Sequence, residues 1–215
     1  MKCPLCDRRK AKRPCPAKNA HICAQCCGEK RVLEINCPES CEYLQLGRQR
    51  EAEEHAKILR LLSPQNHDRH RRVMAAYQDS LARIEYSIGR ERMLNRDLTD
   101  QDVLEAVDIL LETYRTEDKG ILYEKKSENL RVEPMRRELR AVIEALRNPE
   151  GDNDQGIVRT EKPRMQLSSI IECLEFVQAV IKAYQEKRGA GLDYVDLLAR
   201  VIPRAEKKPS SIIFP

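Results

Sequence analysis

The chain has 215 residues, of which 41% are hydrophobic and 34% are charged, and its formal net charge is +4. This length is sufficient for a hydrophobic core, and no stretch approaches the roughly 18 consecutive apolar residues that a membrane-spanning helix needs. The opening residues, MKCPLCDRRK, include no apolar signal segment. We therefore expect a cytoplasmic protein that does not contact a membrane.

Eight of the nine cysteines lie within the first 41 residues, at Cys3, Cys6, Cys15, Cys23, Cys26, Cys27, Cys37 and Cys41. Thiols stay reduced in the cytoplasm, and repeated Cys-x-x-Cys pairs in that compartment are metal sites more often than disulfides. The spacing predicts a zinc-binding module over residues 1–45. Eight thiolates make two sites of four ligands, so we expect two Zn²⁺ per chain.

The spacings suggest how the ligands are presented. Cys3/Cys6 and Cys23/Cys26 have the spacing of zinc knuckles, in which a tight turn points two sulfurs at one ion. Pro38 suits the first position of a helix, which would place Cys37 and Cys41 at a helix N-terminus, where the thiolate form is stabilised. Cys26 and Cys27 are adjacent, and in extended backbone neighbouring side chains point to opposite faces. We therefore expect this pair to serve two different ions.

The sequence leaves two partitions of the ligands open. A cross-brace joins Cys3, Cys6, Cys23 and Cys26 in one site and Cys15, Cys27, Cys37 and Cys41 in the other. A treble-clef arrangement joins Cys23, Cys26, Cys37 and Cys41 and leaves Cys3, Cys6, Cys15 and Cys27. His21 is a spare ligand in either arrangement, because zinc also accepts imidazole.

The same segment is basic. Residues 1–50 carry eleven Lys and Arg against five acidic residues, a formal charge of +6. A site of four thiolates and one dication carries −2, so two sites would reduce this charge to about +2. The run of Arg8, Arg9, Lys10, Lys12 and Arg13 could still contact phosphates, although Tyr43 is the module's one aromatic residue and no stacking platform accompanies the run.

After the vicinal pair, Gly28 is expected in a positive-φ turn and Arg31–Ile35 in a short strand or half of a hairpin. A helix then runs from about Pro38 to Leu62, and Glu51 and His55 have the spacing of a surface ion pair on it. Ser63 and Pro64 start a further helix that extends to Asn95.

Apolar stripes at three- and four-residue spacing predict the remaining helices. Thr99 caps one that ends by Gly120, Pro134 starts another that carries Leu139, and a third spans 167–187. Asp193 caps a last short helix. Residues 148–164 are expected to form a flexible loop and residues 203–215 a mobile tail.

The fold class that follows is mainly α, with little β: a small two-zinc module followed by an α-helical bundle over 46–202. The aliphatic stripes need no ligand to explain them, and Cys173 is expected as a small buried hydrophobic residue. The bundle is expected to pack within one chain, so a monomer is favoured over a dimer.

The sequence offers little for catalysis. It contains no phosphate-cradling glycine loop, no nucleophile elbow and no His-Glu-x-x-His motif. The Cys-x-x-Cys pairs lack the βαβ context of thioredoxin-like redox proteins. We therefore expect a protein that is not an enzyme.

The run from Ile22 to Arg31, ICAQCCGEKR, continues to INCPESCEYL over 35–44. It resembles an N-terminal cysteine motif of uncharacterised bacterial proteins, which covers about the first 45 residues and implies no activity. In spacing it is loosely similar to the cross-brace fingers of the B-box and HIT classes, which implies protein–protein contacts. The interval from Cys15 to Cys23 and the vicinal Cys26 and Cys27 depart from those fingers.

The function expected from the sequence is a protein-interaction or regulatory adaptor in which the zinc module is a rigid recognition surface. The alternative is binding of RNA or DNA through the basic run, and a third hypothesis is a thiol-based redox or zinc-release sensor.

Overall fold

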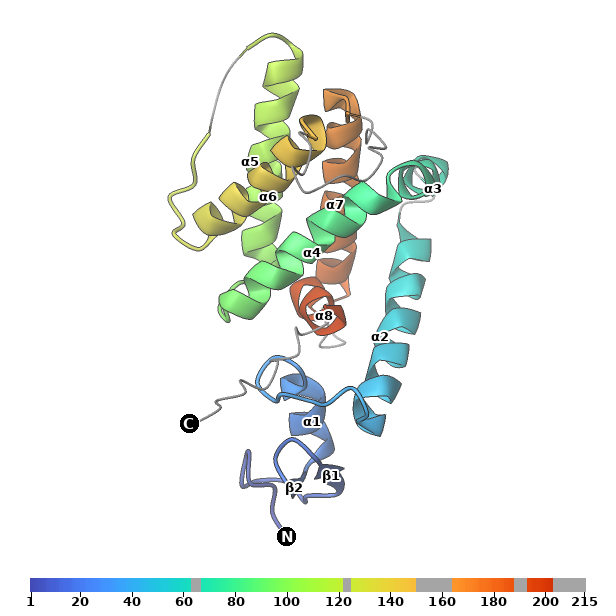
Figure 1. Cartoon of the computed structure of the whole chain (residues 1–215), viewed down its shortest axis with the longest axis vertical. Coiled ribbons are helices and arrows are strands. Elements are labelled where there is room, and N and C mark those ends of the chain that lie inside the picture. Colours follow the sequence, from blue (N-terminus) through green and yellow to red (C-terminus); the bar gives the residue numbers. More distant parts are fainter. Residues whose placement is uncertain (63–66, 122–124, 150–163, 188–192, 203–215) are drawn as a thin grey trace, which may run out of the picture.

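A computed structural model describes residues 1–62, 67–121, 125–149, 164–187 and 193–202. Within these residues it contains eight helices and one two-stranded sheet. Figure 1 shows a small module that includes the N-terminus, with α1, β1 and β2, and a helical domain that α2 joins to it. The predicted mainly α fold with little β is confirmed.

The N-terminal module is built around a short hairpin. Strands β1 (Arg13–Cys15) and β2 (Ala20–Ile22) pair antiparallel, with Arg13 opposite Ile22 and Cys15 opposite Ala20. Helix α1 (Ala24–Lys30) follows directly. The side chains buried together in this module are Cys3, Cys15, Ile22, Cys23, Cys26 and Ile35.

Two local predictions in this module are wrong. Gly28 lies within α1 and does not have a positive φ. The segment Arg31–Ile35 is a tight turn and not a strand: the N–H of Ile35 donates to the carbonyl of Lys30, at 2.8 Å, and Val32 has a φ of 63°. The turn reverses the chain so that Cys37 returns toward α1.

Helix α2 (Glu42–Leu61) begins four residues later than Pro38, with Cys41 as its N-cap residue. It crosses the predicted domain boundary between residues 45 and 46 without interruption. The predicted helix over 64–95 is also divided, into α3 (His67–Ala76) and α4 (Gln78–Leu94). Tyr77 separates them with a φ of −125° and a ψ of 29°, outside the helical region.

The remaining helices are α5 (Asp100–Asp118), α6 (Val132–Arg147), α7 (Leu167–Glu186) and α8 (Tyr194–Val201). Thr99 forms the capping box of α5 with Asp102, as predicted. The N-terminus of α8 differs from prediction, because the side chain of Asp193 caps nothing. Instead the carboxylate of Asp100, on α5, accepts the N–H groups of Tyr194 and Val195 at 3.0 and 2.9 Å.

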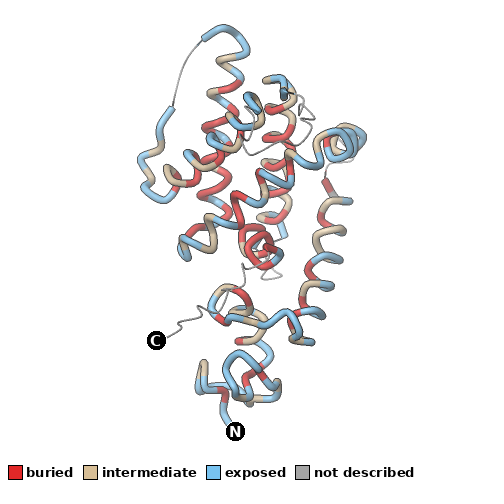
Figure 2. The backbone as a smooth tube through the Cα atoms, in the orientation of Figure 1, coloured by how far each residue is buried: buried red, intermediate tan, exposed pale blue. Residues whose placement is uncertain are grey.

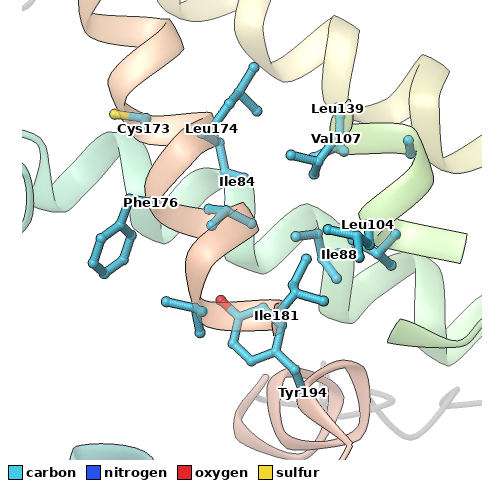
Figure 3. Close-up of a cluster of buried hydrophobic side chains, with 14 of the residues drawn as sticks. Ile84, Ile88, Leu104, Val107, Leu139, Cys173, Leu174, Phe176, Ile181 and Tyr194 are labelled. Carbon is cyan, nitrogen blue, oxygen red and sulfur yellow. The ribbon is translucent and has the colours of Figure 1, made fainter. Parts of the chain in front are cut away.

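The core of the helical domain lies where α4, α5, α6, α7 and α8 meet (Figure 2). Figure 3 shows part of it, with Ile84 and Ile88 of α4, Val107 of α5 and Leu174 of α7 directed toward one another. Cys173 is fully buried, as predicted. The predicted loop lies mostly outside the described residues, and the predicted tail lies entirely outside them.

Candidate metal centre

Four thiols from two segments converge in the module. The sulfur atoms of Cys3, Cys6, Cys23 and Cys26 all lie within 4.8 Å of one another, and those of Cys6 and Cys23 are 4.0 Å apart. A zinc ion with four sulfurs at about 2.3 Å in a tetrahedron places the sulfurs about 3.8 Å apart. The observed spacing therefore suits one ion of this kind, and we refer to these four residues as the first quartet.

The first pair of this quartet sits on a tight turn. The N–H groups of Cys6 and Asp7 donate to the carbonyl of Cys3, at 3.3 and 2.8 Å, and Asp7 takes a φ of 49°. The next two backbone N–H groups, those of Arg8 and Arg9, bond the sulfur of Cys6 and lower the pKa of this thiol to about 6. The turn thus supplies a thiolate ligand at neutral pH.

The second pair spans the first turn of α1. Cys23 is the N-cap residue, and its sulfur accepts the N–H of Cys26 at 3.3 Å, which lowers the pKa of the Cys23 thiol. Cys26 is 2% exposed, and burial raises the pKa of its thiol to about 12. A cation at the centre of the quartet would supply the charge that keeps this buried thiol ionised.

The other four cysteines of the module come from four segments: Cys15 ends β1, Cys27 lies on α1, Cys37 follows the tight turn and Cys41 directly precedes α2. We refer to them as the second quartet. Burial raises the pKa of Cys37, while the N–H of Val32 bonds its sulfur and the nearby charges of Cys41, Cys15 and Cys27 act on it. Among the described residues, however, the first quartet is the one group with its ligand atoms all within 4.8 Å.

This grouping corresponds to the cross-brace partition. The treble-clef partition would place Cys23 and Cys26 with Cys37 and Cys41, but the structure places them with Cys3 and Cys6. The structure places Cys26 in the first quartet and Cys27 outside it, so the expectation that the pair serves two different ions stays a prediction. The reason given for that expectation does not hold. Both residues lie on a helix, where successive side chains diverge by about 100° around the axis, and not in extended backbone.

The spare ligand His21 is not a member of the first quartet. It pairs with Pro14 in the hairpin, while Cys15 pairs with Ala20. Because side chains alternate between the faces of a hairpin, His21 and Cys15 point to opposite faces. His21 is exposed and Cys15 is buried, but both line one surface hollow together with Cys41.

The basic run lies on the outside of the module. Arg8, Arg9, Lys10 and Lys12 are exposed, and the guanidinium of Arg13 lies 4.9 Å from the centre of the Tyr43 ring. The Arg9 side chain also hydrogen-bonds Cys23. The run therefore surrounds the first quartet and reaches the first turn of α2.

The link between the module and the helical domain was not predicted. Arg31 donates to the carbonyl of Gly28, and its guanidinium lies 3.5 Å from the carboxylate of Glu51. The same Glu51 oxygen accepts from Arg200, on α8, at 2.9 Å. Glu51 is 4% exposed, so the predicted surface ion pair with His55 is wrong. His55 instead lies against Tyr184, with its Nδ1 2.7 Å from the tyrosine oxygen.

Gly47 makes this link possible. A Cβ atom at Gly47 would lie 1.1 Å from Nη1 of Arg31, so only glycine leaves space for the guanidinium beside α2. No sequence signal distinguished this glycine. Arg31 lies between two cysteines of the second quartet in the chain, and its side chain therefore ties that segment to α2 and α8.

No helix among the described residues is long and apolar enough to cross a bilayer. Comparison of the chain with protein-family models, with curated proteins and with solved structures finds no match.

Proposed function

We propose that this chain is a non-enzymatic zinc-binding protein of the cytoplasm that acts as a protein-interaction or regulatory adaptor. The observation that carries the proposal is the convergence of the first quartet, with its sulfur atoms within 4.8 Å of one another. Four thiolates in a tetrahedron favour zinc among the common cellular metals. All nine cysteines are free thiols, so none of these ligands is used in a disulfide.

We assign a second zinc ion to the second quartet. Support comes from Cys37, because the charges of Cys41, Cys15 and Cys27 act on its thiol, which indicates that the four thiols lie near one another. A dication among the four would replace this repulsion with attraction and draw the sulfurs together. Two ions per chain would then hold the module together.

A binding role follows from the ligand count. A site whose four positions are all filled by protein ligands leaves none for water or substrate, which is the pattern of structural zinc and not of catalytic zinc. The two ions would fix the shape of the hairpin, α1 and the tight turn. The module would then present a rigid surface for binding.

Elemental analysis with native mass spectrometry of the purified full-length protein tests the metal assignment. We expect two zinc ions per chain, and one after Cys37→Ser, which removes a ligand of the second quartet alone. Cys173→Ser is the matched control and should keep both ions, because Cys173 lies in the helical domain. A protein purified without zinc that also fails to bind added zinc would contradict the proposal.

Nucleic-acid binding through Arg8, Arg9, Lys10, Lys12 and Arg13 is the second candidate, and the exposure of the run favours it. Phosphate contacts of this kind weaken steeply with salt. Titration with a single-stranded RNA and a duplex DNA at low salt tests the candidate. Absence of binding to both removes it.

A further inference from the structure

The positive charge of the module is confined to its first part. Residues 1–22 carry seven basic side chains, Lys2, Arg8, Arg9, Lys10, Lys12, Arg13 and Lys18, and a single acid, Asp7. Residues 23–50 carry four basic and four acidic side chains. The whole formal charge of +6 therefore belongs to the knuckle and the hairpin. Two metal centres would offset about four of these charges and leave about +2, and of the eight ligands Cys3, Cys6 and Cys15 lie within residues 1–22.

These seven cations have no carboxylate partner in the part of the chain that the structure describes, whereas acids later in the module are engaged. Glu34 pairs with Lys30, and Glu39 pairs with Arg48. Six of the seven cations are exposed, and Arg13 is half-buried against Tyr43. Lys2 and Lys10 even face each other across a bridge between two extended residues. Like charges placed together repel, and the thiols of the first quartet offset only part of this repulsion, through Arg9, so an anionic partner would lower the remaining electrostatic energy.

A hollow adjoins these cations. It has a volume of about 390 Å³ and is lined by Pro14, Cys15, Pro16, Asn19, Ala20, His21, Ser40, Cys41, Glu42 and Tyr43. The wall therefore combines prolines and aromatic rings with a few polar side chains, one of them the acid Glu42, and with two cysteines of the second quartet. Arg13 lies over the ring of Tyr43. A space of this size accepts one or two side chains of a bound segment.

We propose that residues 2–22 and Tyr43 form a docking face, here called the basic face, for an acidic segment of a partner protein. Carboxylates of the segment pair with the exposed cations, and one aromatic or aliphatic side chain enters the hollow beside Tyr43. This inference rests on the proposed adaptor function and gives it a partner chemistry.

The backbone favours a peptide over a nucleic acid at this face. Proteins often hold phosphates with free backbone N–H groups as well as side chains. Here the N–H groups of Arg8 and Arg9 bond the sulfur of Cys6, and those of Ala11 and Lys12 donate to carbonyl oxygens. Tyr43 is already stacked with Arg13, so it is not open to a base on that side. Side-chain cations with a partly apolar hollow suit an acidic, partly apolar peptide better.

The test uses the full-length zinc-loaded protein and two fluorescent probes, a random glutamate–tyrosine copolymer and polyglutamate of equal charge. We expect the copolymer to bind at least tenfold more tightly than polyglutamate. Replacing Arg8, Lys10, Lys12 and Lys18 with serine should weaken the binding of both probes tenfold or more. Tyr43→Ala should remove most of the preference for the copolymer and leave polyglutamate binding almost unchanged.

The matched control replaces four exposed cations of the helical domain, Arg72, Arg83, Arg137 and Lys182, with serine. Equal weakening in this control would overturn the proposal, because binding would then depend on net charge alone. Tighter binding of a 20-nucleotide single-stranded RNA than of the copolymer would assign the face to nucleic acid instead. Failure to bind either acidic probe by a protein that carries two zinc ions would remove the basic face but not the zinc assignment.

Discussion

The module and the helical domain are stabilised by different means. The buried cluster of the module contains four cysteines and two isoleucines, Ile22 and Ile35. The helical domain buries long aliphatic stripes from α4 to α8 around residues such as Leu139 and Leu174. At about 25 cal/mol per Å² of buried apolar surface, two isoleucines cannot offset the conformational entropy of some 40 residues. The comparison teaches that the module would need the proposed metal ions in order to fold, whereas the helical domain has a hydrophobic core sufficient to fold without them.

The largest effect should come from removing one ligand of the first quartet. Serine at Cys23 remains a good N-cap for α1, so Cys23→Ser tests the metal and not the helix start. Structural zinc contributes on the order of 10 kcal/mol to small domains, and we expect the variant to lose ordered structure in residues 1–41. Amide NMR spectra and elemental analysis measure this. The helical domain should keep its circular dichroism and its thermal transition.

Cys173→Ser makes the same chemical change in the other region and serves as the control. Cys173 is fully buried among apolar side chains, so the hydroxyl should cost about 1–3 kcal/mol without loss of zinc. If Cys23→Ser kept both its zinc and a folded module, the metal dependence inferred from the comparison would be wrong.

The next effect should be confined to the helical domain. Leu139 is fully buried, and Leu139→Ala should lower the free energy of unfolding by about 2–5 kcal/mol through lost burial and the cavity left behind. Urea denaturation followed by circular dichroism measures the loss. Zinc content should stay at the wild-type value, and a parallel loss of zinc would show that the two regions do not fold separately.

A smaller effect should appear at the link between the regions. Gly47→Ala would place a methyl group on the Arg31 guanidinium and separate it from Glu51, for a cost of about 1–3 kcal/mol. Gly28→Ala is the matched control, because its Cβ would lie 3.9 Å from the same guanidinium, an ordinary contact. In thermal unfolding, Gly47→Ala should have a clearly lower Tm than Gly28→Ala. Equal stability would mean that Arg31 does not couple the module to α2.

The smallest effect concerns a half-buried carboxyl on α4, that of Glu85. The hydroxyl of Tyr194 donates to Glu85 at 2.7 Å, and burial raises the pKa of Glu85 above its usual 4.5. The folded state therefore favours the protonated carboxyl. The resulting contribution to the free energy of unfolding is present below pH 4.5 and is lost as the pH rises through the raised pKa of Glu85. Glu85→Gln stays neutral and still accepts the hydrogen bond.

We expect Glu85→Gln to be more stable than the wild type at pH 7, and the difference to shrink as the pH falls toward 4.5. The urea midpoints of both proteins at several pH values measure this difference. Other titrating groups are the same in the two proteins, so their effects cancel in the difference. A difference that grew on acidification would contradict the direction assigned to Glu85.

Local patterns in the sequence predicted local structure well. The stripes of α5, α6 and α7 and the capping box at Thr99 depend on neighbours within a turn or two, so they could be identified from the chain alone. The cysteine spacing gave the first quartet as part of one of two possible partitions, the cross-brace. The sequence could not decide which cysteines share a site, because the answer depends on how the hairpin and α1 pack against each other.

The errors share a different cause, which is contact with residues distant in the chain. Glu51 was assigned to His55, four residues away, but it pairs with Arg200. The N-terminus of α8 was assigned to Asp193, but Asp100 caps it. Each of these buried carboxylates pairs with a group about 100 residues or more away, and no periodicity in the sequence records such a pairing.

The last cysteine of the module is also the residue from which α2 starts, with no linker between them. Helix α2 has 20 residues and is therefore about 30 Å long, and it packs on α7 and α8. A rotation of α2 about Cys41 would therefore move the far end of the helix. A tilt of about 10° would displace that end by about 5 Å, so binding of a partner to the module could change the position of α2 beside α3.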